Sequence, residues 1–299
     1  MYPWLLKSYQ LLQNSLESGS LHHAIIFYGK QGVGKSRLVA QLSQALLCQT
    51  SKTIGCGQCK SCQLYLAGSH PDFYLIEPEG QIGVDDIREA TNKLSASSHL
   101  MQAKVLVIHN AHKMTVAAAN SLLKTLEEPT KDTYLFLLTD KMDKLLPTIK
   151  SRCQKNLIEV SQQQQVADWL EQEQLVADPA LVSLYWSRPL YLQQLLSDQD
   201  ANVLKQLPQD IELLKQRAMS SDAFANKYAE HLELSLEWMQ LFLKQQMQTI
   251  PDEQHDKFWQ CYQSLIETSS RMHQTGINKP LLFTSFVTSL QNTLSTSSW

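Results

Sequence analysis

The sequence lacks any apolar run of the roughly 20 residues that a membrane-spanning helix needs. Its first residues, Met1 to Trp4, also lack the charged segment followed by an apolar stretch that marks a secretory signal. The chain is not basic either, because 26 Lys and Arg residues stand against 29 Asp and Glu residues, giving a net charge of −3 and a pI near 6.3. Phosphate neutralisation needs clustered Lys and Arg. We therefore expect a cytoplasmic protein that makes no membrane contact and reaches nucleic acid only together with partners.

Cysteine is scarce outside one short segment. Four of the six cysteines, Cys48, Cys56, Cys59 and Cys62, fall within fifteen positions. Thiolates at this spacing suit a closed tetrahedral Zn²⁺ site, and the Gly, Lys and Ser residues between them favour the turns that such a site requires. One or two disulfides are the alternative, which a reducing cytosol disfavours. The sequence predicts a structural zinc module over residues 48–62, with no ligand position left open for catalysis.

A glycine-rich stretch carries the clearest chemistry. Residues 29–36 read Gly-Lys-Gln-Gly-Val-Gly-Lys-Ser, a complete G-x-x-x-x-G-K-S phosphate loop between an expected strand at 24–28 and an expected helix at 37–47. Its glycines let the backbone N–H groups turn toward a phosphate, its final lysine supplies charge for the outer phosphates, and its serine hydroxyl suits Mg²⁺. We expect a nucleoside triphosphate site, with ATP and Mg²⁺ as the candidate ligands. The candidate phosphate-binding residues are Gly29, Gly32, Gly34, Lys35 and Ser36.

The patterning of the chain predicts three parts. The length of 299 residues fits about two or three domains. Over residues 1–160, apolar runs typical of strands buried on both faces alternate with helical patterns, which predicts a parallel α/β domain; the expected strands include 105–108, 134–139 and 157–160. After residue 160 the pattern is helical throughout. We expect a small helical unit over 161–200 and a second helical domain over 201–299, in which residues 222–249 form one long helix.

The chain has no acidic pair where a phosphate-loop ATPase places one. After the expected strand at 105–108, we expect Asn110 and Ala111 to occupy the two acidic positions. The amide accepts only weakly from a metal-bound water, and the alanine has no group that polarises a nucleophile. Losing an activating base commonly costs on the order of a hundredfold in rate. Other acids read more simply as strand-end, capping or surface charges, namely Asp72, Glu77, Asp85, Asp86, Glu127 and Glu128.

Together these motifs resemble the bacterial clamp-loader subunits of the AAA+ family. The resemblance covers residues 20–160 and rests on His22-His23-Ala24, the phosphate loop, the cysteine module, the segment 120–129 and the triplet 151–153, Ser-Arg-Cys. It implies a RecA-like α/β domain with a zinc-binding insertion, then a small helical lid and an all-α C-terminal collar. It also implies membership of a five-membered ring with the gamma/tau and delta subunits of DNA polymerase III, which loads the sliding clamp onto primer–template DNA.

The resemblance further implies roles for single residues. Arg152 resembles the trans-acting arginine that reaches a neighbouring subunit's ATP, although from its position alone it would simply cap the preceding helix. Thr139 resembles the γ-phosphate-sensing position. The expected lid arginine is displaced, with Tyr191 in its place and Arg188 nearby. These departures predict a non-hydrolysing stator within the polymerase holoenzyme.

Three other functions compete with the stator. An ATP-hydrolysing motor subunit, similar to gamma/tau, is favoured by the complete phosphate loop and opposed by the missing acids. A small-molecule kinase would share the loop, but no acceptor site is recognisable. A zinc-dependent DNA-binding module is opposed by the net charge of −3.

Overall fold

The computed structural model describes residues 1–51, 53–100, 102–177, 179–197, 206–247, 252–272 and 276–295. The chain forms two compact units. The first contains Met1–Glu173 and Ser187–Tyr191, and the second contains Gln174–Trp186 and Leu192–Trp299. Within the described ranges, no helix combines the length and the apolar character needed to cross a membrane.

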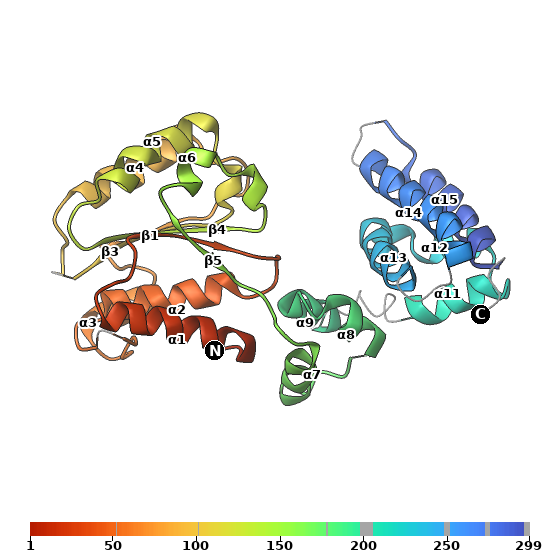
Figure 1. Cartoon of the computed structure of the whole chain (residues 1–299), viewed down its shortest axis with the longest axis horizontal. Helices are drawn as coiled ribbons and strands as arrows, with labels where there is room; N and C mark the ends of the chain where they lie inside the picture. The colour runs from red at the N-terminus through yellow and green to blue at the C-terminus, as the bar shows by residue number, and fades with distance from the viewer. Residues whose placement is uncertain are drawn as a thin grey trace. The chain divides into compact units, whose positions relative to one another are not determined.

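The first unit is built on a five-stranded parallel sheet with the strand order β2-β3-β4-β1-β5. Its central strands are buried along nearly their whole length because helices cover both faces of the sheet (Figure 1). Tyr28 lies opposite Thr139 in the register of β1 and β4, so these two strands end at the same edge. The parallel α/β architecture expected from the apolar runs is confirmed. The strands are β1 (Ala24–Tyr28), β2 (Phe73–Ile76), β3 (Lys104–Ile108), β4 (Thr133–Thr139) and β5 (Gln154–Leu157).

Helices lie on both sides of this sheet. Figure 1 shows α1, α2 and α3 on one side and α4, α5 and α6 on the other. The core on the second side joins apolar residues of α4 and α5 to those of β1, β3 and β4. The helices of this unit are η1 (Pro3–Leu5), α1 (Leu6–Glu17), α2 (Lys35–Leu47), α3 (Lys60–Leu66), α4 (Val84–Ser95), η2 (Ala111–Lys113), α5 (Val116–Glu127), η3 (Met142–Lys144), α6 (Pro147–Lys150) and α7 (Gln163–Gln172).

Buried polar and aromatic contacts fix the ends of several of these elements. The buried Lys104 Nζ donates to the carbonyl oxygens of Leu94 and Ala96 at 2.6 and 2.7 Å, which caps the C-terminal end of α4 with a positive charge. At the N-terminus of the chain, the Trp4 indole N–H donates to the Val33 carbonyl at 2.9 Å. The Trp4 ring also packs edge-on against Trp169 of α7, with ring centroids 5.1 Å apart. The N-terminal segment therefore contacts the phosphate loop through Trp4 and holds it in place.

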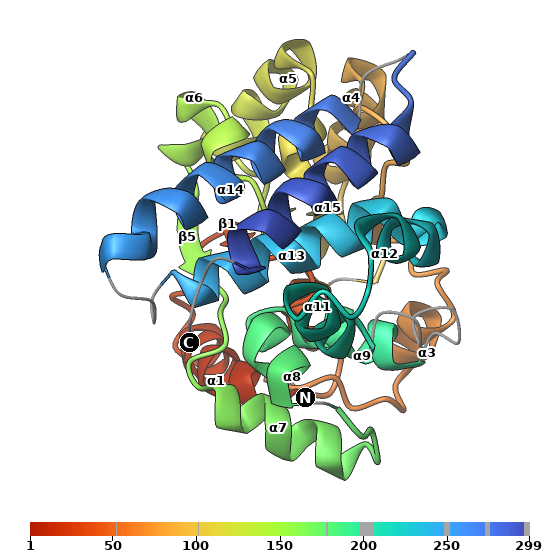
Figure 2. The ribbon, with the colours of Figure 1, turned by 90° about the vertical axis from the view of Figure 1, so that its right-hand side faces the viewer.

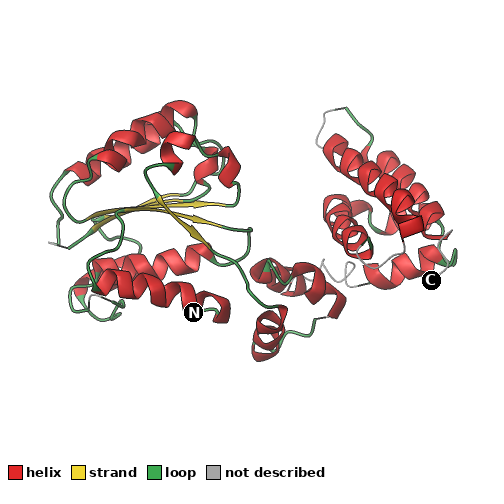
Figure 3. Ribbon diagram, viewed as in Figure 1, coloured by secondary structure: helices red, strands yellow, loops and turns green. Residues whose placement is uncertain are grey.

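The second unit is helical in its described part, as Figure 3 shows by the absence of yellow strands there. Figure 2 shows α13, α14 and α15 running side by side. Phe258 of α14 and Phe283 and Phe286 of α15 are buried in its core. The predicted all-helical C-terminal region is confirmed. The helices after α7 are α8 (Pro179–Tyr185), α9 (Pro189–Ser197), α11 (Leu207–Lys215), α12 (Ser221–Lys227), η4 (Ala229–His231), α13 (Leu232–Gln246), α14 (Asp252–Met272) and α15 (Lys279–Ser295), and the first residues of α9 belong to the first unit.

Two element predictions are wrong. The last strand is Gln154–Leu157 rather than 157–160, because this mostly polar edge strand pairs with β1 while the buried Ile158 and Val160 follow its end. The predicted single helix over 222–249 is broken after Lys227, and its last two residues lie outside the described residues. At the break, Lys227 Nζ and the Tyr228 hydroxyl both donate to the buried carboxylate oxygen Oδ2 of Asp210, at 2.5 and 2.7 Å.

Two domain boundaries were predicted from the sequence. The boundary between residues 160 and 161 stays a prediction. The boundary between residues 200 and 201 lies outside the described residues.

Candidate nucleotide site and candidate metal centre

The phosphate loop leaves β1 and enters α2 at the carboxyl edge of the sheet. Gly29, Gly32 and Gly34 adopt φ angles of 152°, 79° and 93°. Residues that carry a Cβ rarely adopt such positive φ angles. A Cβ on Gly29 would also collide with the carbonyl oxygen of Ile158. Because the N-terminus of α2 carries unpaired N–H groups and the positive end of the helix dipole, the loop is shaped to receive an anion.

A cavity of about 240 Å³ opens in front of this loop. Its walls come from the loop, from the turn after β3, from the end of β4 and from the start of α9. The structure therefore brings all the predicted phosphate-site residues except Gly29 into one cavity lining. The lining residues are Gln31, Gly32, Gly34, Lys35, Ser36, Arg37, His109, Asn110, Leu138, Thr139, Asp140 and Leu190.

Lys35 is held on the loop's own backbone. Its Nζ donates to the carbonyl oxygens of Gly29 at 2.8 Å and Lys30 at 3.0 Å. Burial lowers the pKa of Lys35 to about 8, and the negative charge of Asp140 opposes that shift. The ammonium group therefore lies on the phosphate loop and lines the cavity.

The lowered pKa of Lys35 predicts that nucleotide affinity decreases as the pH rises above about 8. Only the ammonium form pairs with a phosphate, so the affinity is full below that pKa and falls up to about tenfold per pH unit above it. The guanidinium of Lys35→Arg does not titrate in this range, so that variant should lose the pH dependence even if its affinity is lower. Titration with a fluorescent ATP analogue from about pH 7 to about pH 9.5 measures both profiles. A flat wild-type profile would contradict the prediction.

The turn after β3 corrects one sequence interpretation. Asn110 lies in the left-handed region with φ of 48° and precedes η2 as its N-cap residue, and Ala111 behind it is fully buried in the hydrophobic core. The two residues that line the cavity here are His109 and Asn110, not Asn110 and Ala111 as expected. The Nδ1 atom of His109 lies 3.0 Å from Glu77 Oε1. Neither of these two lining residues carries a carboxylate.

The end of β4 supplies a second polar cluster. The Thr139 hydroxyl accepts from the backbone N–H of Lys141 at 3.0 Å and lies 3.0 Å from His112 Nδ1. Asp140 Oδ1 lies 3.3 Å from the same imidazole nitrogen. Burial lowers the pKa of His112, and Asp140 opposes this shift. Sequence reasoning missed Asp140, although an acidic residue directly after a buried strand of the sheet was a usable signal.

The segment Ser187–Tyr191 lies against the phosphate loop within the first unit. Leu190 N–H donates to the Gly32 carbonyl at 3.0 Å, and Lys30 Nζ donates to Ser187 Oγ at 2.9 Å. The Arg188 guanidinium lies over the Tyr191 ring, 4.1 Å from its centroid, in cation–π geometry. The two residues that were expected to replace the lid arginine are thus neighbours beside the loop, and their roles toward a nucleotide stay predictions.

Arg152 lies elsewhere, at the end of α6. Its Nε and one terminal nitrogen donate to Glu127 Oε1 at 2.7 and 2.5 Å, and its other terminal nitrogen donates to the Thr148 carbonyl at 3.0 Å. The Arg152 side chain remains 34% exposed. It is not among the residues that line the nucleotide cavity. The structure therefore does not bring Arg152 together with the chain's own phosphate loop.

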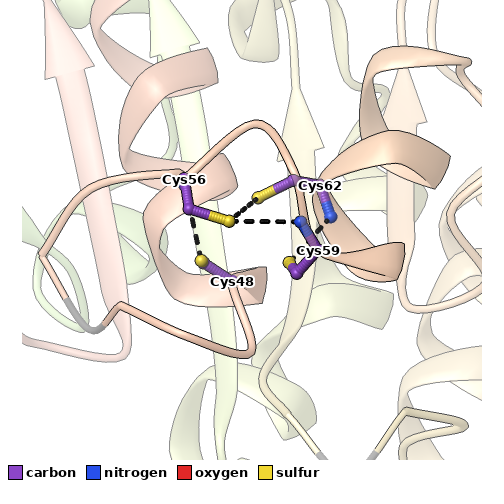
Figure 4. Close-up of side chains that lie close together, drawn as sticks. All are labelled: Cys48, Cys56, Cys59 and Cys62. Carbon is purple, nitrogen blue, oxygen red and sulfur yellow. Dashed lines mark hydrogen bonds between the residues drawn. The ribbon is translucent and has the colours of Figure 1, made fainter.

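The four clustered cysteines converge on one point (Figure 4). Their sulfur atoms all lie within 4.8 Å of one another. Backbone N–H groups point at these sulfurs: Cys59 N–H donates to Cys56 Sγ at 3.3 Å, and Cys62 N–H donates to Cys59 Sγ at 3.4 Å. Four convergent soft donors with N–H support fit a tetrahedral Zn²⁺ ion. Cys48, Cys56, Cys59 and Cys62 could thus hold a metal ion, as the sequence predicted.

The surroundings shift the pKa values of two of these thiols in opposite directions. The Thr50 hydroxyl, followed by the N–H groups of Cys59 and Gln58, lowers the pKa of Cys56 to about 5. Burial raises the pKa of Cys62 to about 12. A thiol of that kind is deprotonated at neutral pH only when a cation compensates its charge. A bound metal ion would displace the proton of the Cys62 thiol and compensate the negative charge of the sulfurs.

A buried polar relay anchors the cysteine module, and no sequence motif predicted it. Asp72 N–H donates to His70 Nδ1 at 3.1 Å, so His70 carries its proton on Nε2 and donates it to Ser61 Oγ at 2.7 Å. The Ser61 hydroxyl then donates to the Leu47 carbonyl at 2.5 Å. Since Leu47 precedes Cys48 and Ser61 precedes Cys62, the relay fixes two of the four cysteines relative to each other.

Comparisons with known proteins are concentrated on one family. A family model described as "DNA polymerase III, delta subunit" matches residues 5–162. The protein named "DNA polymerase III subunit delta'" in Escherichia coli K12 is 40% identical over 186 residues, which cover 61% of this chain and 56% of that relative. The protein of the same name in Pseudomonas aeruginosa PAO1 is 36% identical over 252 residues, covering 80% and 74%. The chain thus matches less than two thirds of the length of the E. coli relative.

One solved structure supports the same fold. A DNA polymerase III gamma subunit-related protein of Thermotoga maritima covers 96% of this chain and 99% of its own, with a TM-score of 0.55 and 20% identity. At that identity the likeness concerns the fold alone. Together with the parallel sheet and the helical region that follows it, this likeness confirms the predicted fold, a parallel α/β domain followed by a helical region.

Proposed function

Because the chain belongs to the family of DNA polymerase III delta-prime subunits, we propose that it serves the clamp loader as a stator. In this role it presents Arg152 to the ATP of a neighbouring subunit and hydrolyses little ATP itself. The proposed neighbours are gamma/tau and delta subunits in a five-membered ring. The sliding clamp and primer–template DNA are reached through that ring, in the cytoplasm. The chain would be a component of the polymerase holoenzyme without polymerising DNA itself.

The placement of Arg152 is the observation that carries this proposal. The guanidinium is fixed by Glu127 and by the Thr148 carbonyl, yet a third of the side chain stays exposed. It lies outside the chain's own nucleotide cavity. A planar, permanently charged group that is pre-positioned at the surface suits the phosphates of a second molecule, where it would stabilise charge in phosphoryl transfer.

The nucleotide cavity supports binding more strongly than hydrolysis. Lys35, Ser36 and the N-terminus of α2 fit a nucleoside triphosphate, while His109 and Asn110 stand where a hydrolysing site needs carboxylates. We therefore propose that this chain binds ATP with Mg²⁺ and turns it over slowly. The second candidate, an ATP-hydrolysing motor subunit, is favoured by the complete phosphate loop and by the carboxylate of Asp140 in the same cavity.

Two further assignments belong to the same proposal. The ion of the cysteine module is proposed to be Zn²⁺ in a structural role, because four cysteine sulfurs leave no open ligand position. Residues 161–200 and 201–299 are proposed to be the lid and the collar of the ring subunit.

Reconstitution tests the proposed function directly. Purified partner subunits would be combined with and without this chain, and loading of the sliding clamp onto primed DNA would be measured. We expect both loading and clamp-stimulated ATP turnover to require the chain. Full loading by the partners alone would contradict the proposal.

Glu127 is expected to position Arg152 for its neighbour. In Glu127→Gln the side chain keeps an oxygen acceptor but loses the charge that holds two guanidinium nitrogens, so we expect ring ATP turnover to fall by about tenfold, or about 1.4 kcal/mol in barrier. The double variant Glu127→Gln/Arg152→Ala should be no slower than Arg152→Ala alone, because Glu127 acts through Arg152. Additive losses in this double-mutant cycle would show that Glu127 has an independent role.

A further inference from the structure

The nucleotide cavity contains one carboxylate that no motif predicted. Among the described residues that line it, Asp140 is the only acidic one. Its side chain is 25% exposed, so it is partly shielded and still open to the cavity. The other charged lining groups are Lys35 and Arg37, and His109 adds an imidazole. Asp140 is therefore the carboxylate of this lining that is available to a cation in the cavity.

The sheet order places Asp140 between the two halves of the site. β4 lies between β1, which carries the phosphate loop, and β3, which ends before His109 and Asn110. Thr139 is opposite Tyr28 of β1, and Leu137 is opposite Ile108 of β3. Asp140 follows directly, so it stands between the loop and the turn that lacks its acidic pair. Its charge also acts on Lys35 across the cavity.

The oxygen donors around this point fit a magnesium ion. The Ser36 hydroxyl, the Asn110 side-chain amide and the Asp140 carboxylate belong to residues of the same cavity lining. Mg²⁺ prefers hard oxygen ligands, keeps several waters and needs only one or two carboxylates besides the phosphates. His112 Nδ1, 3.3 Å from Asp140 Oδ1, also contacts the Thr139 hydroxyl, so the carboxylate has a partner that fixes its orientation.

We propose that Asp140 positions the hydrated divalent cation of a bound nucleoside triphosphate, in the role that the turn after β3 leaves unfilled. This inference rests on the proposed function only in that the chain binds a nucleotide. When bound, the cation neutralises phosphate charge, and Asp140 orients its water shell while Lys35 contacts the phosphates directly. The carboxylate contribution thus comes from the residue that directly follows β4, rather than from the turn after β3.

Metal-dependent binding by the full chain tests this inference. ATPγS affinity would be measured by calorimetry in Mg²⁺ and in EDTA for wild type, Asp140→Asn and the control Asp143→Asn, whose carboxylate lies on η3, is exposed and does not line the cavity. We expect Mg²⁺ to raise wild-type and control affinity by about tenfold or more, a gain of about 1.4 kcal/mol per tenfold. Asp140→Asn should lose most of that gain while its affinity in EDTA stays equal or rises, because a negative charge near the phosphates has been removed.

A second readout follows the cation itself. With Mn²⁺ in place of Mg²⁺, electron paramagnetic resonance should detect a bound ion in the ATPγS complex of wild type and of Asp143→Asn, and much weaker binding in Asp140→Asn. An undiminished metal gain or Mn²⁺ signal in Asp140→Asn would overturn the inference, as would a wild-type affinity that is equal in Mg²⁺ and EDTA. Failure of wild type to bind ATPγS under either condition would overturn it together with proposed nucleotide binding, while the proposed role of Arg152 is tested separately by ring turnover.

Discussion

Changing Arg152 to alanine in this subunit alone is expected to lower ATP turnover at the neighbouring site by about a thousandfold. The guanidinium would stabilise the charge that develops on the γ-phosphate, and an alanine offers nothing in its place. Other sites of the ring would keep some activity, so the total turnover falls less than turnover at that one site. We expect the total clamp- and primer-stimulated turnover of the reconstituted ring to fall by at least about tenfold. Steady-state phosphate release measures this loss.

Two matched variants separate charge from geometry in that experiment. Arg152→Lys keeps a positive charge but cannot reproduce the bonds that the guanidinium makes to Glu127 and to the Thr148 carbonyl, so it should recover little activity. Lys150→Ala removes a neighbouring cation of α6 and should leave turnover near wild type. Ring assembly would be checked by gel filtration. Turnover within about twofold of wild type in an assembled Arg152→Ala ring would contradict the trans-acting role.

Removing the metal from the cysteine module is the second change with a large expected effect. Structural Zn²⁺ binds zinc-finger peptides with about 10–16 kcal/mol of apparent free energy, much of which is folding free energy. We expect wild type to purify with one zinc ion per chain and Cys59→Ser to lose it. We also expect the thermal midpoint to fall clearly, because the loop that joins α2 to α3 would lose its main tertiary constraint. Plasma emission analysis and thermal melting with and without chelator measure both effects.

The control for that experiment is a cysteine in the second unit. Cys261 is buried in α14 and has no part in the cluster, so Cys261→Ala should keep full zinc content whatever it costs in stability. A wild-type chain that carries no zinc, or whose melting is insensitive to both chelator and Cys59→Ser, would contradict a structural metal site.

Local sequence signals accounted for much of the fold. The strands β1, β3 and β4 were predictable because strands covered on both faces must be apolar along their whole length. The edge strand β5 was misplaced for the same reason. Its residues Gln154–Leu157 are mostly polar, whereas the apolar signal came from Ile158 and Val160, which are buried after the strand has ended.

The candidate sites also contain a part that the sequence predicted and a part that it did not. The phosphate loop and the cysteine cluster are each contiguous in sequence, so their spacing alone indicated their chemistry. The pair of Arg152 with Glu127 joins residues 25 positions apart, and the pair of Asp140 with His112 depends on the register of β3 and β4. Such pairs are products of tertiary packing, which no local pattern encodes.

Ala111 shows how a small backbone feature changes an interpretation. From sequence spacing, it was expected to occupy the second of the two positions that hold acidic residues in a phosphate-loop ATPase. Asn110 adopts the left-handed conformation, and the residues that line the cavity lie one position earlier than expected. Ala111 is buried, and His109 lines the cavity together with Asn110. Asparagine adopts this conformation more readily than most residues other than glycine, so Asn110 was a local signal that the sequence interpretation did not use.

The most direct test of a stator compares two variants of this subunit in the same reconstituted ring. Clamp- and primer-stimulated ATP turnover would be measured for wild type, Arg152→Ala and Lys35→Ala. A stator predicts that Arg152→Ala removes most of the turnover, while Lys35→Ala, which disables only the chain's own phosphate loop, changes it by less than about twofold. If Lys35→Ala is instead the damaging change and Arg152→Ala is neutral, the subunit works as a motor and the proposed function is wrong.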